Sequence, residues 1–103
     1  MTDVQTFVPY VSDRTEHRIE IALGQDRTSV FTGDDLDRPV WVVCLHDGSP
    51  SGPTWRTVGA PARSKSSASA TVQKIENGAY KWGKNAPAKV LGITVIAVPG
   101  FDF

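Results

Sequence analysis

The chain has 103 residues, and its eleven Lys and Arg side chains balance its eleven Asp and Glu side chains. This length fits one domain, 1–103, and leaves no room for two domains with separate cores. The zero net charge argues against a protein that coats nucleic acid or a membrane surface, and no membrane partner is expected. The charge is unevenly distributed, however. Residues 1–50 carry nine acidic side chains against four Arg, and residues 51–103 carry two against seven Lys and Arg.

Most of the apolar side chains are of the kind that favours strands. The sequence has twelve Val, five Ile and nine Thr against four Leu and one Met. β-Branched side chains are stiff at χ1 and pack well on a pleated sheet. Nine Gly and seven Pro interrupt the chain, and no stretch of 11 or more residues has the apolar spacing of an amphipathic helix. These features predict an all-β fold.

The first half of the chain contains three predicted strands. Val4–Val11 is an edge strand, because Pro9 cannot donate a ladder hydrogen bond. In His17–Leu23, apolar and charged side chains alternate with a period of two, which indicates one buried and one solvated face. Thr28–Thr32 is a weaker candidate, and an acidic loop over 32–38 follows it.

Two later segments are apolar on both faces. Val40–Leu45 and Val90–Val98 are short apolar runs, so both are predicted to be central strands buried on both sides. Gly92, inside the second run, marks a bulge or a close backbone approach. Between the two runs, Thr54–Gly59 is a weaker strand candidate, and the Ser-rich Ala60–Ala70 has the composition of a flexible loop.

The clearest local signal is Asn77-Gly78, because this pair supplies the two positive φ angles of a type I′ turn. The sequence therefore predicts a hairpin that places Ile75 opposite Tyr80 and Gln73 opposite Trp82. In total we expect about eight short, mostly antiparallel strands, which is the range of a sandwich, a jelly roll or a small barrel.

Cys44 is the single cysteine, so an intramolecular disulfide is excluded. His46 lies two residues away on the same strand face, and this pair is the basis of one candidate function, a Cys-dependent small enzyme. Asp47 would point to the opposite face, where it is badly placed to orient His46. A lone cysteine in a central strand is more often a core residue. We therefore assign no catalytic residue and expect a protein that is not an enzyme.

No metal site and no cofactor are predicted. Asp34, Asp35 and Asp37 gather three carboxylates but lack the alternating ligands and the glycine of a calcium loop. His17 and His46 are 29 residues apart and have no second cysteine, so a zinc motif has no support. Phosphate-binding glycine loops and the common catalytic motifs are absent from the sequence as well.

A second candidate function is the binding of single-stranded nucleic acid or another polyanion. Alternating aromatic and basic side chains on a sheet stack bases while their cations contact phosphates. The candidate nucleic-acid contacts are Trp55, Tyr80, Lys81, Trp82 and Lys84. Two of these aromatic residues share a predicted face with Ile75, which suits a core equally well, and the neutral chain is unlike most such domains.

The favoured function is that of a non-enzymatic structural or interaction module, which self-assembles or docks on a larger complex. The tail from Pro99 to Phe103 carries two phenylalanines, which are unfavourable in water unless they dock. Contact between oppositely charged halves of two copies would be heterologous and would form rings or arrays. The candidate assembly contacts are Phe101, Phe103, Pro9 and Tyr10.

The expected partner is therefore protein, either a second copy or a larger assembly, ahead of nucleic acid. Small decoration or tail components of virions are an analogy of size and class. The N-terminus lacks the basic and apolar segments of a signal peptide, so cytoplasmic synthesis is expected, and the analogy suggests the virion as a location.

Overall fold

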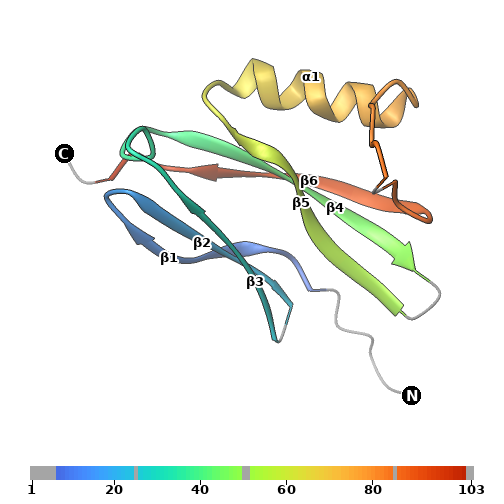
Figure 1. Cartoon of the computed structure of the whole chain (residues 1–103), viewed down its shortest axis with the longest axis horizontal. Coiled ribbons are helices and arrows are strands. Elements are labelled where there is room, and N and C mark those ends of the chain that lie inside the picture. Colours follow the sequence, from blue (N-terminus) through green and yellow to red (C-terminus); the bar gives the residue numbers. More distant parts are fainter. Residues whose placement is uncertain (1–6, 25, 50–51, 85, 102–103) are drawn as a thin grey trace.

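The computed structural model describes residues 7–24, 26–49, 52–84 and 86–101, which form two antiparallel sheets and one helix (Figure 1). The first sheet has the strand order β1-β2-β3 and the second β5-β4-β6. The elements are β1 (Tyr10–Thr15), β2 (Arg18–Gly24), β3 (Arg27–Thr32), β4 (Val40–Ser49), β5 (Gly52–Ala62), α1 (Lys65–Glu76) and β6 (Val90–Val98). The mostly-β prediction is confirmed. A closed barrel is wrong, because each sheet keeps two edge strands.

The first sheet has the alternation that its sequence predicts. On β2, Ile19 and Ile21 are fully buried, while Arg18 and Glu20 lie on the solvated face. The Arg18 guanidinium donates to Asp13 and to Glu20, at 3.0 Å in each case. The Ser12 hydroxyl and Arg18 lower the pKa of the Glu20 carboxyl by hydrogen bonding to its charged form.

The first strand is an edge strand, as expected, but its bounds differ from the prediction. β1 begins at Tyr10, directly after Pro9, and continues to Thr15. Residues 4–6 of the predicted strand lie outside the described part of the chain. The strand starts late because Pro9 has no N–H to contribute to the ladder with β2.

Strand β4 is the centre of the second sheet and is buried on both faces, which confirms that prediction. Val42 and Cys44 point towards the first sheet, and Val43 and Leu45 point towards α1. The core between the two sheets consists of Ile19, Ile21, Leu23, Leu36, Val40, Val42, Cys44, Trp55 and Val98. The core beneath the helix consists of Val43, Leu45, Val58, Ala68 and Ile75. The molecule therefore has three layers, with the second sheet in the middle (Figure 1).

Strand β6 is not the central strand that the sequence predicts. Among the described strands it pairs with β4 alone and forms one edge of the second sheet. The expected irregularity does occur, because the register with β4 shifts between the pairs His46–Gly92 and Asp47–Val90. Leu91 is the extra residue of this bulge.

The Ser-rich segment is a helix, so its prediction as a flexible loop is wrong. Ala68, Val72 and Ile75 of α1 lie on the face that packs against the second sheet. Their spacing of four and three residues is helical. The Ser64 side chain caps the start of α1 by accepting a hydrogen bond from the Ser67 N–H at 3.1 Å.

The predicted hairpin at Asn77-Gly78 is also wrong, because this pair ends the helix. Asn77 keeps a right-handed backbone (φ −86°), and only Gly78 has a positive φ (73°). The N–H groups of Gly78 and Ala79 donate back to the carbonyls of Ile75 and Lys74 at 3.2 and 2.8 Å. Glycine with positive φ just after the last turn is the usual helix stop.

The cap gives a direct test of the helix. Replacing Ser64 by Ala removes the acceptor for the Ser67 N–H, so the free energy of unfolding should fall by about 1 kcal/mol in urea titrations. Ser69→Ala is the matched control, because this residue is exposed within α1, away from the cap, and Ala is the better helix former there. Equal stability of the two variants would contradict the cap.

Candidate functional site

Cys44 lies in the core between the two sheets. Its side chain is fully buried, and burial raises the pKa of the thiol to about 12. Burial has this effect because a thiolate loses its hydration there. A nucleophilic cysteine needs the opposite, a lowered pKa and access to solvent. The surroundings of Cys44 are those of a structural core residue.

His46 and Asp47, which lie close to Cys44 in the sequence, also make structural contacts. The imidazole of His46 stacks on the Trp55 indole, with 4.4 Å between ring centroids and an interplanar angle of 7°. Asp47 Oδ1 accepts hydrogen bonds from the N–H groups of Ala88 and Lys89, at 3.0 and 3.3 Å. It thereby holds the segment that leads into β6. The expectation that Asp47 does not orient His46 agrees with these contacts.

The structure separates the five predicted nucleic-acid contacts. Trp55 lies between the sheets, is 8% exposed, and donates its Nε1–H to the Phe7 carbonyl at 2.8 Å. Tyr80 and Trp82 are half-buried on the opposite face of the second sheet, against the core beneath α1. Lys81 and Lys84 are exposed. Trp55 therefore cannot act on the same surface as the other four residues.

A smaller aromatic and basic cluster remains on that opposite face. The rings of Tyr80 and Trp82 are 4.5 Å apart at 55°. The Arg56 guanidinium lies over the Trp82 ring, 5.3 Å from its centroid. This cation–π contact occupies one face of the indole. The cluster therefore belongs partly to the core and partly to the surface.

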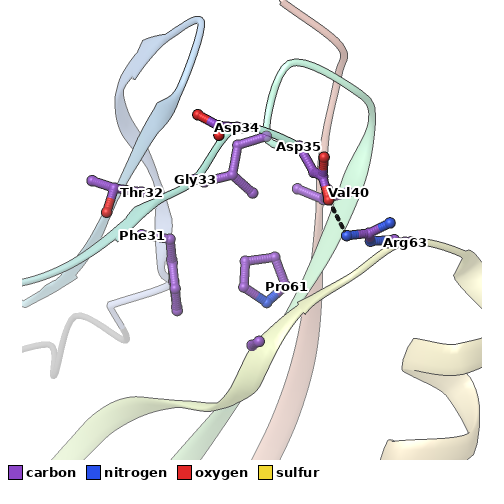
Figure 2. A pocket seen from close by; sticks show the side chains of 10 residues that line it. Phe31, Thr32, Gly33, Asp34, Asp35, Val40, Pro61 and Arg63 are labelled. Atoms are coloured by element: carbon purple, nitrogen blue, oxygen red, sulfur yellow. Dashed lines mark hydrogen bonds and ion pairs between the residues drawn. The ribbon is translucent and has the colours of Figure 1, made fainter.

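A pocket of about 360 Å³ opens between the β3–β4 loop and the end of β5 (Figure 2). The β5 register slips opposite Trp41 and Val43, and Gly59 at the slip has a positive φ (71°). This bulge brings Ala60 and Pro61 to the wall of the pocket. The lining residues are Phe31, Thr32, Gly33, Asp34, Asp35, Leu36, Val40, Ala60, Pro61 and Arg63.

Few of the side chains that line the pocket could take part in catalysis. Phe31 and Pro61 face its interior, and an ion pair between Asp35 and Arg63 crosses its rim (Figure 2). Both charged side chains are mostly exposed, so their pairing adds little to stability. Over the residues that the structure describes, no group of three or more His, Cys, Asp or Glu side chains is arranged to hold a metal ion.

The predicted assembly contacts lie in different surroundings. The Tyr10 side chain is 55% exposed, whereas Pro9 is buried. Phe101 is half-buried, and its N–H donates to the Asp37 carbonyl at 2.8 Å. Phe103 lies outside the described residues. Of the three that the structure describes, Tyr10 has the side chain most open to a partner.

The apolar surface that the sequence did not predict lies on β6. Val90, Leu91 and Val95 are 42%, 46% and 37% exposed. They are half of the large hydrophobic side chains that are exposed in the described part of the chain, and the others are Val8, Tyr10 and Val30. The helix packs mainly on β4 and β5, so these three side chains stay exposed, while Ile93, Ile96 and Val98 of the same strand pack in the two cores. The apolar run Val90–Val98 is visible in the sequence, but its composition alone predicts a buried central strand and not an exposed edge.

The four edge strands of the described sheets differ in how they are protected. β1 contains Asp13 and Arg14, β3 contains Arg27, and β5 contains Arg56 and two prolines. β6, with the sequence VLGITVIAV, contains no charge and no proline. Charges and prolines on edge strands prevent pairing with other chains. β6 has only its bulge and is therefore the least protected edge.

Comparison of the chain with protein-family models, with curated proteins and with solved structures finds no match. Among the described residues, α1 is too short and too polar to cross a membrane, and no other helix is found.

The burial of Cys44 predicts an inert thiol. Because its pKa is raised to about 12, the thiol stays protonated at pH 8 and should not react with iodoacetamide in the folded protein. In denaturant it should react as a free thiol does. The same shift predicts that stability falls as the pH rises above about 9, where only the unfolded chain loses this proton. Fast labelling of the native protein at pH 8 would contradict the buried position.

Proposed function

We propose that the protein is a non-enzymatic β-sandwich module that works by self-assembly or by docking on a larger complex, with the free edge of β6 as its contact surface. The observation that carries this proposal is the combination of an unpaired strand edge, exposed apolar side chains and the absence of charge on the same nine residues. Such an edge is a template for pairing with another strand.

The neighbourhood of β6 supports this use. Arg14 of β1 donates to the carbonyl of Pro99 at 2.9 Å, so the chain is held just beyond the C-terminal end of the strand. At the other end, the Gly48 N–H donates to the Lys89 carbonyl at 2.7 Å. Both ends are thus fixed while the middle of the edge stays open. A rigid, preformed strand loses little conformational entropy when a partner strand pairs with it.

Small decoration or tail components of virions remain the analogy for such a module, with the virion as its location. The analogy rests on size and on the β-rich architecture. The buried and weakly acidic Cys44 supports a role without covalent chemistry.

A charge placed on the open edge should abolish assembly. Val95→Lys introduces an ammonium group at an exposed position, so we expect the variant to fold. Pairing of β6 with another strand would then cost the desolvation of this charge. We expect the wild type to sediment above its 11.1 kDa monomer mass at high concentration, and V95K to remain monomeric and to aggregate less on heating. The matched control is Val30→Lys on edge strand β3, where Val30 is 46% exposed, and it should behave as the wild type does.

The proposal is contradicted if the wild type stays monomeric at all concentrations and aggregates on heating no more than V95K. It is also contradicted if V30K and V95K have the same effect, because the property would then belong to surface charge in general and not to the β6 edge.

Nucleic-acid binding is the second candidate, favoured by the cluster of Arg56, Tyr80 and Trp82 with exposed Lys81 and Lys84 nearby. If β6 is the functional surface, titration with a single-stranded oligothymidylate at low salt should leave the tryptophan fluorescence unchanged. Quenching that is lost at high salt and in the double variant K81A/K84A would instead assign the function to this cluster.

A further inference from the structure

We infer that the partner of β6 is β6 of a second copy of this chain. The two strands pair antiparallel about Thr94, the middle residue of Val90–Val98, and form one continuous six-stranded sheet with the order β5-β4-β6-β6-β4-β5. This inference rests on the proposed function, and it adds the identity of the partner and the symmetry of the contact.

The chemistry of the available strand edges favours a second β6 as the partner. A strand that pairs with β6 places its side chains beside a strand without charge, so a charged partner would lose solvation without gaining an opposite charge. β1 and β3 carry charged side chains, and β5 contains prolines, which cannot donate to a ladder. Within the described chain, the uncharged and proline-free edge that matches β6 is β6 itself.

The register of β6 on β4 favours a contact centred on Thr94. Pairing about Thr94 places Ile93 of one copy opposite Val95 of the other and Gly92 opposite Ile96, so it uses the regular part of the strand on the C-terminal side of the bulge at Leu91. Antiparallel partners lie on the same face of a sheet. Ile93 and Val95 pair with Leu45 and Val43 of β4, whose side chains lie in the core beneath α1. Two copies would therefore join these cores and bury the exposed Val95.

The edge of β6 has room for a second strand, and a two-fold contact there closes at a dimer. α1 packs mainly on β4 and β5, on the side of the sheet away from the β6 edge, so it leaves room for a second strand. A two-fold contact uses the same surface on both copies and closes at a dimer. No free β6 edge remains in such a dimer, so further strands cannot be added there. The head-to-tail arrays suggested by the opposite charges of the two halves would not form through this edge.

Two single-cysteine variants test the register in the full chain. In the inferred dimer, the side chains at position 95 of the two copies are diagonal neighbours, about 7–8 Å apart. Those at position 90 are separated by eight residues along the ladder, roughly 26 Å. Val95→Cys should therefore give a covalent dimer of twice 11.1 kDa with a short bismaleimide, and Val90→Cys should not. Both positions are exposed to a similar degree, and the wild type with its buried Cys44 is the blank.

The outcomes separate this inference from the proposed function. A dimer mass in sedimentation, with cross-linking of V95C alone, supports the two-fold pairing. Three outcomes would contradict the two-fold pairing but not assembly through β6. They are equal cross-linking of both variants, a dimer in which neither variant cross-links, and masses beyond the dimer. A protein that is monomeric throughout overturns the two-fold pairing as well. The proposed function then survives only if V95K, and not V30K, suppresses aggregation on heating.

Discussion

Strand β4 carries apolar side chains on both of its faces, so its sheet has to be covered from two sides. The rest of the structure follows from this requirement. The first sheet supplies one cover through Ile19 and Ile21, and α1 supplies the other through Ala68 and Ile75. Burial of apolar surface is the main favourable term in folding, at roughly 25 cal/mol per Å². A strand with two apolar faces is stabilised by burial on each face, but only if the chain provides both covering layers.

The two covers are unequal, and the inequality leaves part of β6 exposed. The first sheet has three strands and spans the width of its neighbour, whereas a single helix covers β4 and β5. The side chains of Val95 and Ala97 on β6 therefore lie at the margin of the helix layer, where they are exposed. Natural edge strands are usually protected by charges or prolines, and β6 has neither. The monomer accounts for Ile93, Ile96 and Val98, which pack in the two cores, whereas a partner strand of the proposed kind would cover Val95.

The sequence was informative where structure follows from neighbouring residues, and less so where it depends on distant ones. Alternation predicted β2, and the apolar run predicted β4 as a strand covered on both sides. The helix was missed because its buried face has only three apolar residues, Ala68, Val72 and Ile75, among serines and other small side chains. Asn-Gly suits both a hairpin and a helix end, because both need glycine with positive φ. The place of β6 at an edge depends on strand order, which no local pattern encodes.

The uneven distribution of charge along the chain places most acidic side chains in the layer of the first sheet and most basic side chains in the second sheet and the helix layer. Residues 7–39, which contain the first sheet, carry seven acidic side chains and four Arg, and residues 40–101 carry two acidic side chains against seven Lys and Arg. Pairs such as Arg18 with Asp13 neutralise part of the acidic layer locally, and Asp35 with Arg63 joins the layers. A two-fold pairing of β6 places like layers on the same side of the continuous sheet. Repulsion between the like-charged layers of the two copies is screened over roughly 8–10 Å at physiological salt. In the inferred dimer the uncharged β6 strands lie between these layers. Apolar contacts and backbone hydrogen bonds would therefore hold the interface.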